Sequence, residues 1–256
     1  FGTLQTQNFT TATDTYNTAV GYNAGAAVTT GVQNTLIGGL AGDALTDADS
    51  NAVFGMQALT TDTLGSKTTA IGHSALATQN FTTATDSNNT AVGYAAGLSV
   101  TTGVQNTLIG KDAGEFATTA DNSVFIGYQA GQGITGTKLT GNGNVAVGKA
   151  AGLLLQGAAA GNTLIGQRAG ETLTTGGENI LIGTRAGSHN ISLQTGNNNI
   201  CIGGYSDVPA TDTDNAIAIG YDVAGVGGFT TVGNSTDDIR AAHGTATWAA
   251  VSDERY

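Results

Sequence analysis

Histidine, cysteine and aspartate are the side chains of this 256-residue sequence best suited to chemistry, and they are widely scattered. His73, His189 and His243 lie far apart, without the short spacings that place imidazoles around one metal ion. Cys201 is the single cysteine, so no disulfide forms within the chain. We therefore expect no catalytic centre, no metal site and no cofactor.

Two groups of aspartates could supply loop oxygens to a calcium ion. One group is Asp43, Asp47 and Asp49, and the other is Asp212 and Asp214. Neither group has the full spacing of a calcium-binding loop, so we interpret both as solvated acidic turns. A carbohydrate-cleaving enzyme would need two carboxylates at a fixed separation across a cleft, and the repeat supplies no such pair. We expect a protein without enzymatic activity.

The amino-acid composition excludes several classes of protein. The 19 acidic and 8 basic residues give a net charge of -11, which repels a phosphate backbone, so nucleic acid is not expected as a partner. No apolar run approaches the roughly 18 residues of a membrane span, and we expect no membrane insertion. With 40 glycines, 1 proline and 39% hydrophobic residues, the chain is predicted to be turn-rich β-structure rather than disordered. The start, Phe1-Gly2-Thr3, lacks a signal pattern, and we expect a mature product or an excerpt.

A unit of the form Asn-Thr-apolar-apolar-Gly-x-x-Ala-Gly repeats along the sequence, as at residues 17–25, 34–42 and 162–170. The central glycines follow a 17-residue period, with occasional insertions of three or four residues, so each unit is predicted to form one turn of a solenoid. We expect the asparagine to form a stacked ladder or a turn hydrogen bond, and the glycine to adopt a positive φ at a corner. The turn glycines are Gly21, Gly38, Gly55, Gly72, Gly93, Gly110, Gly127, Gly148, Gly166, Gly183, Gly203, Gly220 and Gly233.

The residue before each turn glycine is β-branched in all copies but one. β-Branched side chains favour strands, and a glycine every few residues excludes a helix. We assign this column to the core ladder of the solenoid. It comprises Val20, Ile37, Phe54, Ile71, Val92, Ile109, Ile126, Val147, Ile165, Ile182, Ile202, Ile219 and Val232.

A second apolar column lies one residue earlier, from Ala19 to Ala218. Because successive strand residues point to opposite faces, two adjacent apolar columns indicate that both faces of the strand are covered. The simplest cover for the outer face is another copy of the chain, packed around a common axis. The small residue three positions after each glycine, such as Ala24 or Ala41, suits a narrow interior or a tight contact between chains, and we expect the interior. A 17-residue turn has room for two strands of about five residues and two connections.

An internal duplication supports this organisation. Residues 6–42 match residues 78–114 at all but seven of 37 positions, at an offset of 72 residues or four turns. Duplication of whole turns is tolerated where each unit contacts mainly its neighbours, as in a solenoid. The predicted fold class is therefore all-β: a parallel β-solenoid of about 13 turns with about 17 residues per turn.

The repeat resembles the head repeats of YadA-like trimeric autotransporters over nearly the whole chain, through units such as Asn122–Gly127 and Asn215–Gly220. The resemblance implies a left-handed parallel β-roll that forms a homotrimer along its long axis and has an adhesive role. Turns in that family are usually shorter than the period of this sequence, so the connecting loops are expected to differ.

The C-terminal end resembles the junction between phage tail fibres or spikes and a self-cleaving intramolecular chaperone, through Trp248 and the run Ser252-Asp253-Glu254-Arg255-Tyr256. The family motif is Ser-Asp-x-Arg-apolar-Lys, and this sequence stops one residue before the lysine. The resemblance implies that Ser252 is the nucleophile of a Ser–Lys self-cleavage pair, which is inert here without its lysine. The expected domains are a β-roll repeat array at residues 1–233 and a neck at residues 234–256 that leads to this junction.

Taken with these resemblances, the sequence predicts a structural and adhesive segment of a trimeric extracellular fibre on a virion surface. Its expected partners are its own copies and a cell-surface receptor or glycan. The alternatives are the head of a bacterial trimeric surface adhesin and an ice-binding β-solenoid. Ice binding needs regular Thr-x-Thr ranks, whereas the sequence offers Thr-Thr pairs such as Thr29-Thr30 and Thr101-Thr102.

The insertions between turns are candidate receptor loops, because extra residues in a solenoid form loops on one face, which is often the binding face. These loops run from Asn80 to Asn88, from Ile134 to Gly143 and from Asn190 to Asn198, with Tyr128, Tyr205 and Tyr221 beside them. Plain spacer loops are the alternative, since surface loops tolerate insertion without function.

Overall fold

A computed structural model describes residues 2–190, 193–244 and 249–250 of the chain. Their backbone forms an all-β parallel β-solenoid of about 13 turns with about 17 residues per turn, which confirms the predicted class and repeat length. The residues fall into two compact units, unit 1 at residues 1–129 and unit 2 at residues 130–256. No helix in the described residues is long and apolar enough to cross a bilayer.

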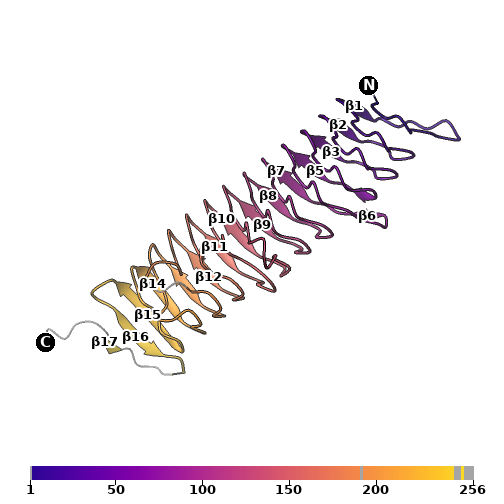
Figure 1. Cartoon of the computed structure of the whole chain (residues 1–256). Helices are drawn as coiled ribbons and strands as arrows, with labels where there is room; N and C mark the ends of the chain where they lie inside the picture. The colour runs from indigo at the N-terminus through magenta and orange to yellow at the C-terminus, as the bar shows by residue number, and fades with distance from the viewer. Residues whose placement is uncertain (1, 191–192, 245–248, 251–256) are drawn as a thin grey trace. The chain divides into compact units, whose positions relative to one another are not determined.

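Unit 1 contains one short strand of its main sheet in each turn, and these strands stack in parallel (Figure 1). The stack runs in the order β1 (Thr18–Val20), β2 (Thr35–Ile37), β3 (Ala52–Phe54), β5 (Thr69–Ile71), β7 (Thr90–Val92), β8 (Thr107–Ile109) and β9 (Val124–Ile126). A separate small sheet pairs β4 (Gly65–Ser66) with β6 (Thr85–Asp86). Equivalent residues of successive turns are paired in the sheet, as Ala19 is paired with Leu36. The sequence repeat is thereby converted into columns of side chains about 4.8 Å apart.

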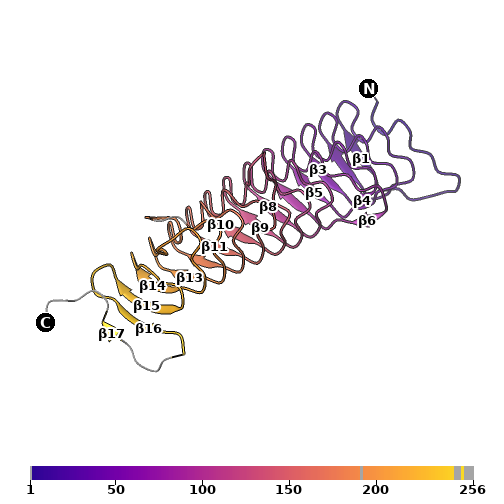
Figure 2. The ribbon, with the colours of Figure 1, turned by 60° about the horizontal axis from the view of Figure 1, so that its bottom comes forward.

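Unit 2 has the same arrangement over most of its length. Its parallel strands are β10 (Val145–Val147), β11 (Thr163–Ile165), β12 (Ile180–Ile182), β13 (Ile200–Ile202), β14 (Ile217–Tyr221) and β15 (Phe229–Asn234). Two antiparallel strands, β16 (Ile239–Ala242) and β17 (Ala249–Ala250), follow β15 (Figure 2). The direction of strand pairing therefore changes after Asn234.

A typical turn contains one three-residue strand rather than the two strands of about five residues that its length allows. Outside the strands, successive turns still bind one another: the N–H of Gly38 donates to the carbonyl oxygen of Val20 (2.8 Å), and that of Leu40 to Tyr22 (2.8 Å). The strands are short because several positions of each turn are left-handed, such as Gly38 at φ 139° and Leu40 at φ 58°. A left-handed residue ends the extended geometry of a strand. The prediction of two long strands per turn is therefore wrong.

Twelve of the turn glycines, from Gly21 to Gly220, adopt a positive φ, as predicted, with values from 126° to 148°. The prediction is wrong for Gly233, which lies inside strand β15 and has no positive φ. Most of the twelve also lie close to the backbone of the next turn. A Cβ atom at Gly21, for example, would lie 2.5 Å from the carbonyl oxygen of Gly38. The close approach of two backbones therefore requires glycine in addition to the φ value.

The interior of both units is filled by the column one residue before the assigned core ladder. Leu36, Val53 and Leu108 are at most 1% exposed, whereas Val20 and Phe54 are each 57% exposed. The core-ladder assignment is therefore wrong for the single chain, because successive strand residues point to opposite faces and the other column points inward. The side chains of the assigned column that instead face outward are Val20, Ile37, Phe54, Ile71, Val92, Ile109, Ile126, Val147, Ile165, Ile182, Ile202, Ile219 and Val232.

The small residues three positions after the turn glycines lie in the interior, as predicted. Ala24, Ala41 and Ala58 are completely buried. Larger apolar side chains, such as those of Leu45 and Leu59, are completely buried elsewhere in the same turns. Each turn therefore fills its interior with small and large apolar side chains together, as close packing requires.

A ladder of buried asparagines connects successive turns, as predicted. The Oδ1 atom of Asn17 accepts a hydrogen bond from the backbone N–H of Asn34 (2.8 Å), and the Nδ2 group of Asn34 donates to the carbonyl oxygen of Ala48 (2.7 Å). Each amide thus satisfies backbone groups that would otherwise be buried without partners. The members that are at most 2% exposed are Asn34, Asn51, Asn89 and Asn106 in unit 1, and Asn144, Asn162, Asn179 and Asn199 in unit 2.

Candidate functional site

The most regular exposed feature of each unit is its outer strand face, which we define as the first and third residues of strands β1–β3, β5 and β7–β14. The third position carries the outward β-branched column. Val20 is 57% exposed there, and Ile109 and Ile202 are each 37% exposed. Strand pairing keeps this column in register, as between Val20 and Ile37 or between Ile182 and Ile202. In the single chain, the third position of the outer strand face is therefore a regular array of apolar side chains in contact with solvent.

The first position of the outer strand face differs between the two units. It is mostly threonine in unit 1 and mostly valine or isoleucine in unit 2. Its residues are Thr18, Thr35, Ala52, Thr69, Thr90, Thr107 and Val124 in unit 1, and Val145, Thr163, Ile180, Ile200 and Ile217 in unit 2. The outer strand face carries no charged residue in either unit, although the chain has a net charge of -11. Depletion of charge is typical of the centre of a protein interface.

The residue after each turn glycine is often an exposed aromatic or basic residue. In unit 1 the rings of His73 and Tyr94 stack with their centroids 5.3 Å apart. The Nζ atom of Lys111 lies 5.5 Å from the centroid of Tyr94 and 5.4 Å from that of Tyr128, within cation–π range. The hydrogen bond that Lys111 donates to Asp112 (2.5 Å) is the main cause that raises the pKa of Lys111. These side chains form an aromatic and cationic ridge along unit 1.

A second aromatic cluster lies in unit 2 beside the inserted loop that starts at Asn190. The centroids of Tyr205 and Tyr221 are 5.6 Å apart, and that of His189 lies 4.6 Å from Tyr205. The Nε2 atom of His189 lies 4.0 Å from a carboxylate oxygen of Asp222. Tyr221 is 57% exposed and Tyr205 is half-buried. A tyrosine combines an apolar ring with a polar hydroxyl and is suited to contact with a partner, so the cluster is a candidate contact surface.

The first candidate receptor loop, residues 80–88, is held to its neighbours at both ends. The backbone N–H of Asn80 donates to the carbonyl oxygen of Thr101 (2.9 Å). The backbone N–H of Ser87 donates to the carbonyl oxygen of Ser66 (2.9 Å) at the other end. Asn88 is exposed, and its Nδ2 group donates within the loop to the carbonyl oxygen of Asp86 (3.1 Å). The middle of the loop, residues 82–84, is exposed and available for contact.

The other two candidate receptor loops lie in unit 2. Ile134 is half-buried, and Gly143 is exposed with φ 69°. The N–H of Asn190 donates to a carboxylate oxygen of Asp207 (2.7 Å), and Asn198 is exposed and left-handed at φ 58°. Residues 191 and 192 of the last loop lie outside the described residues. The exposed parts of these loops are accessible, and their role in binding stays a prediction.

The aspartate groups connect neighbouring turns. Asp43 accepts a hydrogen bond from the hydroxyl of Thr60 (2.6 Å), and Asp214 accepts one from the N–H of Asn197 (2.5 Å). Within the described ranges, no three His, Cys, Asp or Glu side chains are grouped closely enough to hold a metal ion. These two aspartates therefore act as hydrogen-bond acceptors between turns of the solenoid.

Cys201 is buried in β13 and is held as a thiol. Desolvation by burial raises the pKa of Cys201 to about 12, and the charge of Asp207 adds to this shift. Only the thiolate is a good nucleophile or metal ligand. Cys201 therefore acts as a small apolar side chain at neutral pH.

A buried polar network around Asp62 was missed in the sequence. Asp62 and Gln79 are completely buried, and the Nε2 group of Gln79 donates to Asp62 (2.7 Å). Asp62 also accepts a hydrogen bond from the N–H of Phe81 (3.0 Å), and Asn89 donates to the Oε1 atom of Gln79 (2.9 Å). The sequence contained a signal, because Asp62 stands one full repeat after the buried Leu45, at an interior position of the turn. A carboxylate at such a position needs a specific set of donors.

The fold and the outer strand face together define a parallel β-solenoid repeat protein with an uncharged, regularly patterned flank. Comparisons of the chain with protein-family models, with curated proteins and with solved structures found no match. The suspected self-cleavage residue, Ser252, lies outside the described residues. The resemblances to YadA-like heads and to fibre–chaperone junctions therefore stay predictions.

Proposed function

We propose that the chain is a structural segment of a homotrimeric extracellular fibre, in which three copies pack along their outer strand faces. The observation that carries this proposal is the outward β-branched column of the outer strand face. Ile109 and Ile202, for example, are each 37% exposed in the single chain. Complete burial of such a side chain stabilises by about 1.5–3 kcal/mol. Covering the exposed third of about a dozen of them contributes on the order of 8 kcal/mol per copy, before the cost of association.

A second copy of the chain is the partner that matches this face best. The side chains of the outer strand face recur at the interstrand spacing of about 4.8 Å, and a partner with another spacing falls out of register within a few turns. Packing around a common axis buries the same face of every copy. The lack of charge on the face favours this arrangement, because like charges of identical copies would otherwise be brought together.

In this proposal the segment is a shaft or head of a viral tail fibre, located outside the cell on a virion surface, and it is not an enzyme. The loops at residues 80–88, 134–143 and 190–198 are where a receptor or glycan binds.

The viral assignment depends on the resemblance around Ser252. The head of a bacterial trimeric surface adhesin is the alternative. The two are distinguished by the protein sequence that follows Tyr256 in the full-length gene product, since a lysine and a chaperone domain are expected there only for a viral fibre.

A second candidate function is ice binding, which is favoured by the threonines on the outer strand face of unit 1. Thr18 and Thr35 pair with each other, as do Thr90 and Thr107, and each lies two residues before a β-branched side chain. A flat array that combines hydroxyl and methyl groups at regular spacing can order water next to an ice surface. Thermal hysteresis at millimolar protein would support this function, and its absence removes the candidate.

Sedimentation velocity and chemical crosslinking test the leading proposal. We expect a particle of three times the 25.4 kDa chain mass and a crosslinked band of the same size. The double variant Ile182→Asp/Ile202→Asp places two charges on the outer strand face and should dissociate the trimer. Thr195→Asp, at an exposed position outside that face, should leave it intact. A strictly monomeric wild-type particle refutes the proposal, and an unchanged trimer in the double variant refutes the proposed surface.

A further inference from the structure

Strand β1 lies at the edge of the parallel stack of unit 1. Among the described residues, no strand pairs with β1 on the side away from β2. Its duplicate within the chain, β7, lies between β5 and β8. Residues 6–42, which we call the first copy of the duplication, are nearly identical to residues 78–114, the second copy. The surroundings of β7 therefore show what the sequence around β1 can bind.

Both copies make the same contacts with the turn that follows them. The hydroxyl of Thr6 donates to carbonyl oxygens of the next turn, and so does the hydroxyl of the equivalent Thr78. The backbone N–H groups of Asn8 (3.1 Å) and Asn80 (2.9 Å) likewise donate to the next turn. The two copies therefore agree on this side, and the difference between them lies on the side of the preceding turn.

The second copy is bound to the preceding turn by the buried polar network around Asp62. Its carboxylate accepts hydrogen bonds from the side chain of Gln79 (2.7 Å) and from the N–H of Phe81 (3.0 Å). The hydroxyls of Ser87 and Thr68 lie 2.6 Å apart across the same contact. All five residues are buried, with at most 6% of any of them exposed. A buried carboxylate with this many donors specifies one arrangement of the two turns.

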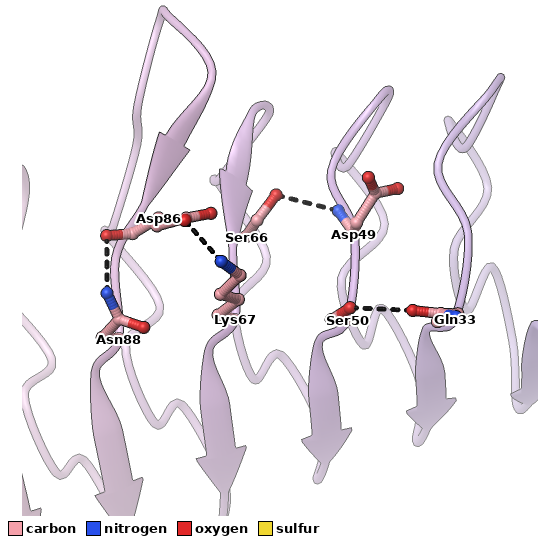
Figure 3. A network of polar contacts seen from close by, with 7 residues as sticks. All are labelled: Gln33, Asp49, Ser50, Ser66, Lys67, Asp86 and Asn88. Atoms are coloured by element: carbon pink, nitrogen blue, oxygen red, sulfur yellow. Dashed lines mark hydrogen bonds and ion pairs between the residues drawn. The ribbon is translucent and has the colours of Figure 1, made fainter.

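An ion pair connects the same two turns at the surface. The Nζ atom of Lys67 lies 2.5 Å from a carboxylate oxygen of Asp86, and Asn88 binds the backbone of Asp86 beside it (Figure 3). Both charged side chains are about half exposed, and exposed pairs contribute little to stability. The buried network, rather than this ion pair, therefore determines how the turns dock.

The first copy carries the same glutamine and phenylalanine, with Thr15 in place of Ser87, but it lacks the preceding turn that partners them in the second copy. Gln7 and Phe9 correspond to Gln79 and Phe81, yet both are partly exposed. No hydrogen bond of the Gln7 side chain occurs within the described ranges. Ala19 is also partly exposed, whereas the equivalent residue of β7 is completely buried. The edge of unit 1 thus presents a set of donors and apolar groups that the second copy uses to hold a preceding turn.

We propose that this edge is a docking site for one more solenoid turn, which presents a carboxylate to Gln7 and to the N–H of Phe9 and adds a parallel strand to β1. The occupant is a protein segment with the chemistry of residues 60–72: an aspartate at the interior position, a hydroxyl six residues later and a Thr-Ala-Ile strand. Strand addition of this kind is a common mode of recognition. Another molecule of the same chain does not supply the turn, because its residues 60–72 are already bound to its own residues 78–114.

A graft into the full chain tests the docking site. Residues 1–5 are replaced by a copy of residues 39–77, so that the graft joins Thr6 as the chain itself joins Thr78. In the second copy, the N–H of Gly93 donates to the carbonyl oxygen of the preceding turn (2.8 Å). The equivalent Gly21 should gain the same hydrogen bond, and we expect its amide to exchange with solvent at least about tenfold more slowly in the grafted protein.

Two variants within the graft separate specific docking from simple lengthening of the chain. Asp62→Ala in the grafted copy removes the acceptor for Gln7 and Phe9 and should abolish most of the protection of Gly21. Met56→Ala in the grafted copy changes an exposed side chain and should leave the protection unchanged. The proposal is overturned if Gly21 exchanges equally fast with and without the graft, or if the protection survives Asp62→Ala.

Sedimentation of the same samples identifies the occupant. If the ungrafted chain forms end-to-end assemblies that the graft abolishes, another molecule of the same chain fills the site and our assignment is wrong. Exchange at Gly21 depends only on the edge of unit 1 and requires no association through the outer strand face. The failure of this inference can therefore be distinguished from a failure of the proposed trimer.

Discussion

Asn106→Ala is the sharpest test of the asparagine ladder. The Oδ1 atom of Asn106 accepts a hydrogen bond from the N–H of Ser123 (2.9 Å), and its Nδ2 group donates to the carbonyl oxygen of Ala120 (2.7 Å). All three residues are at most 2% exposed, so the substitution leaves two backbone groups buried without partners. Each orphaned group costs about 1–3 kcal/mol, and we expect the free energy of unfolding to fall by about 4 kcal/mol.

Chemical denaturation of the full chain measures the total loss, and hydrogen exchange of the Ser123 amide reports it at the site. The local measurement is needed because a repeat array does not always unfold in a single cooperative step. Asn8→Ala is the control, since Asn8 is exposed and is not left-handed, and the loss should stay within about 0.5 kcal/mol. A loss below about 1 kcal/mol at Asn106, or one equal to the control, would falsify the role of the ladder.

Two further predictions concern the turn glycines and the buried thiol. A Cβ atom at Gly166 would lie 2.6 Å from the carbonyl oxygen of Gly183, at φ 131°, so Gly166→Ala should destabilise by about 3 kcal/mol or more. Gly136→Ala, where nothing lies within 4 Å, should change the thermal midpoint little, and similar midpoints for the two variants would contradict the reasoning. Because burial raises the pKa of Cys201 from 9.0 to about 12, the stability it contributes is complete below pH 9 and is lost as the pH rises towards 12. The free energy of unfolding of the wild type, measured relative to Cys201→Ala, should fall by about 1.4 kcal/mol per pH unit in this window, and a difference independent of pH would contradict it.

The repeat allowed the strand and the corner of each turn to be predicted from the sequence. A glycine that recurs once per repeat, preceded by a β-branched residue, is compatible with a strand that ends at a corner, and the structure has a positive φ at Gly21 and Gly38. The asparagine column was equally informative, because the same polar residue at the same place in each turn can only stack on its own kind. Asn34 and Asn51 form such contacts.

The sequence did not predict which face of each strand points into the interior. Val53 and Phe54 are adjacent and both apolar, and their order does not indicate which of them points inward. The structure buries Val53 and leaves Phe54 57% exposed. Strand length was overestimated for a related reason: left-handed residues such as Leu40 are not marked by glycine, so the early end of the strand had no signature.

The amino-acid sequence alone determined the period, the β-structure and the roles of glycine and asparagine. Each of these depends on a local conformational or hydrogen-bonding requirement that recurs from turn to turn. The tertiary structure alone decided which apolar column fills the interior, and it alone brought Asp62 together with Gln79 and Phe81. Both of these depend on where the chain passes one turn later, and that position follows from the geometry of the whole coil rather than from any single repeat.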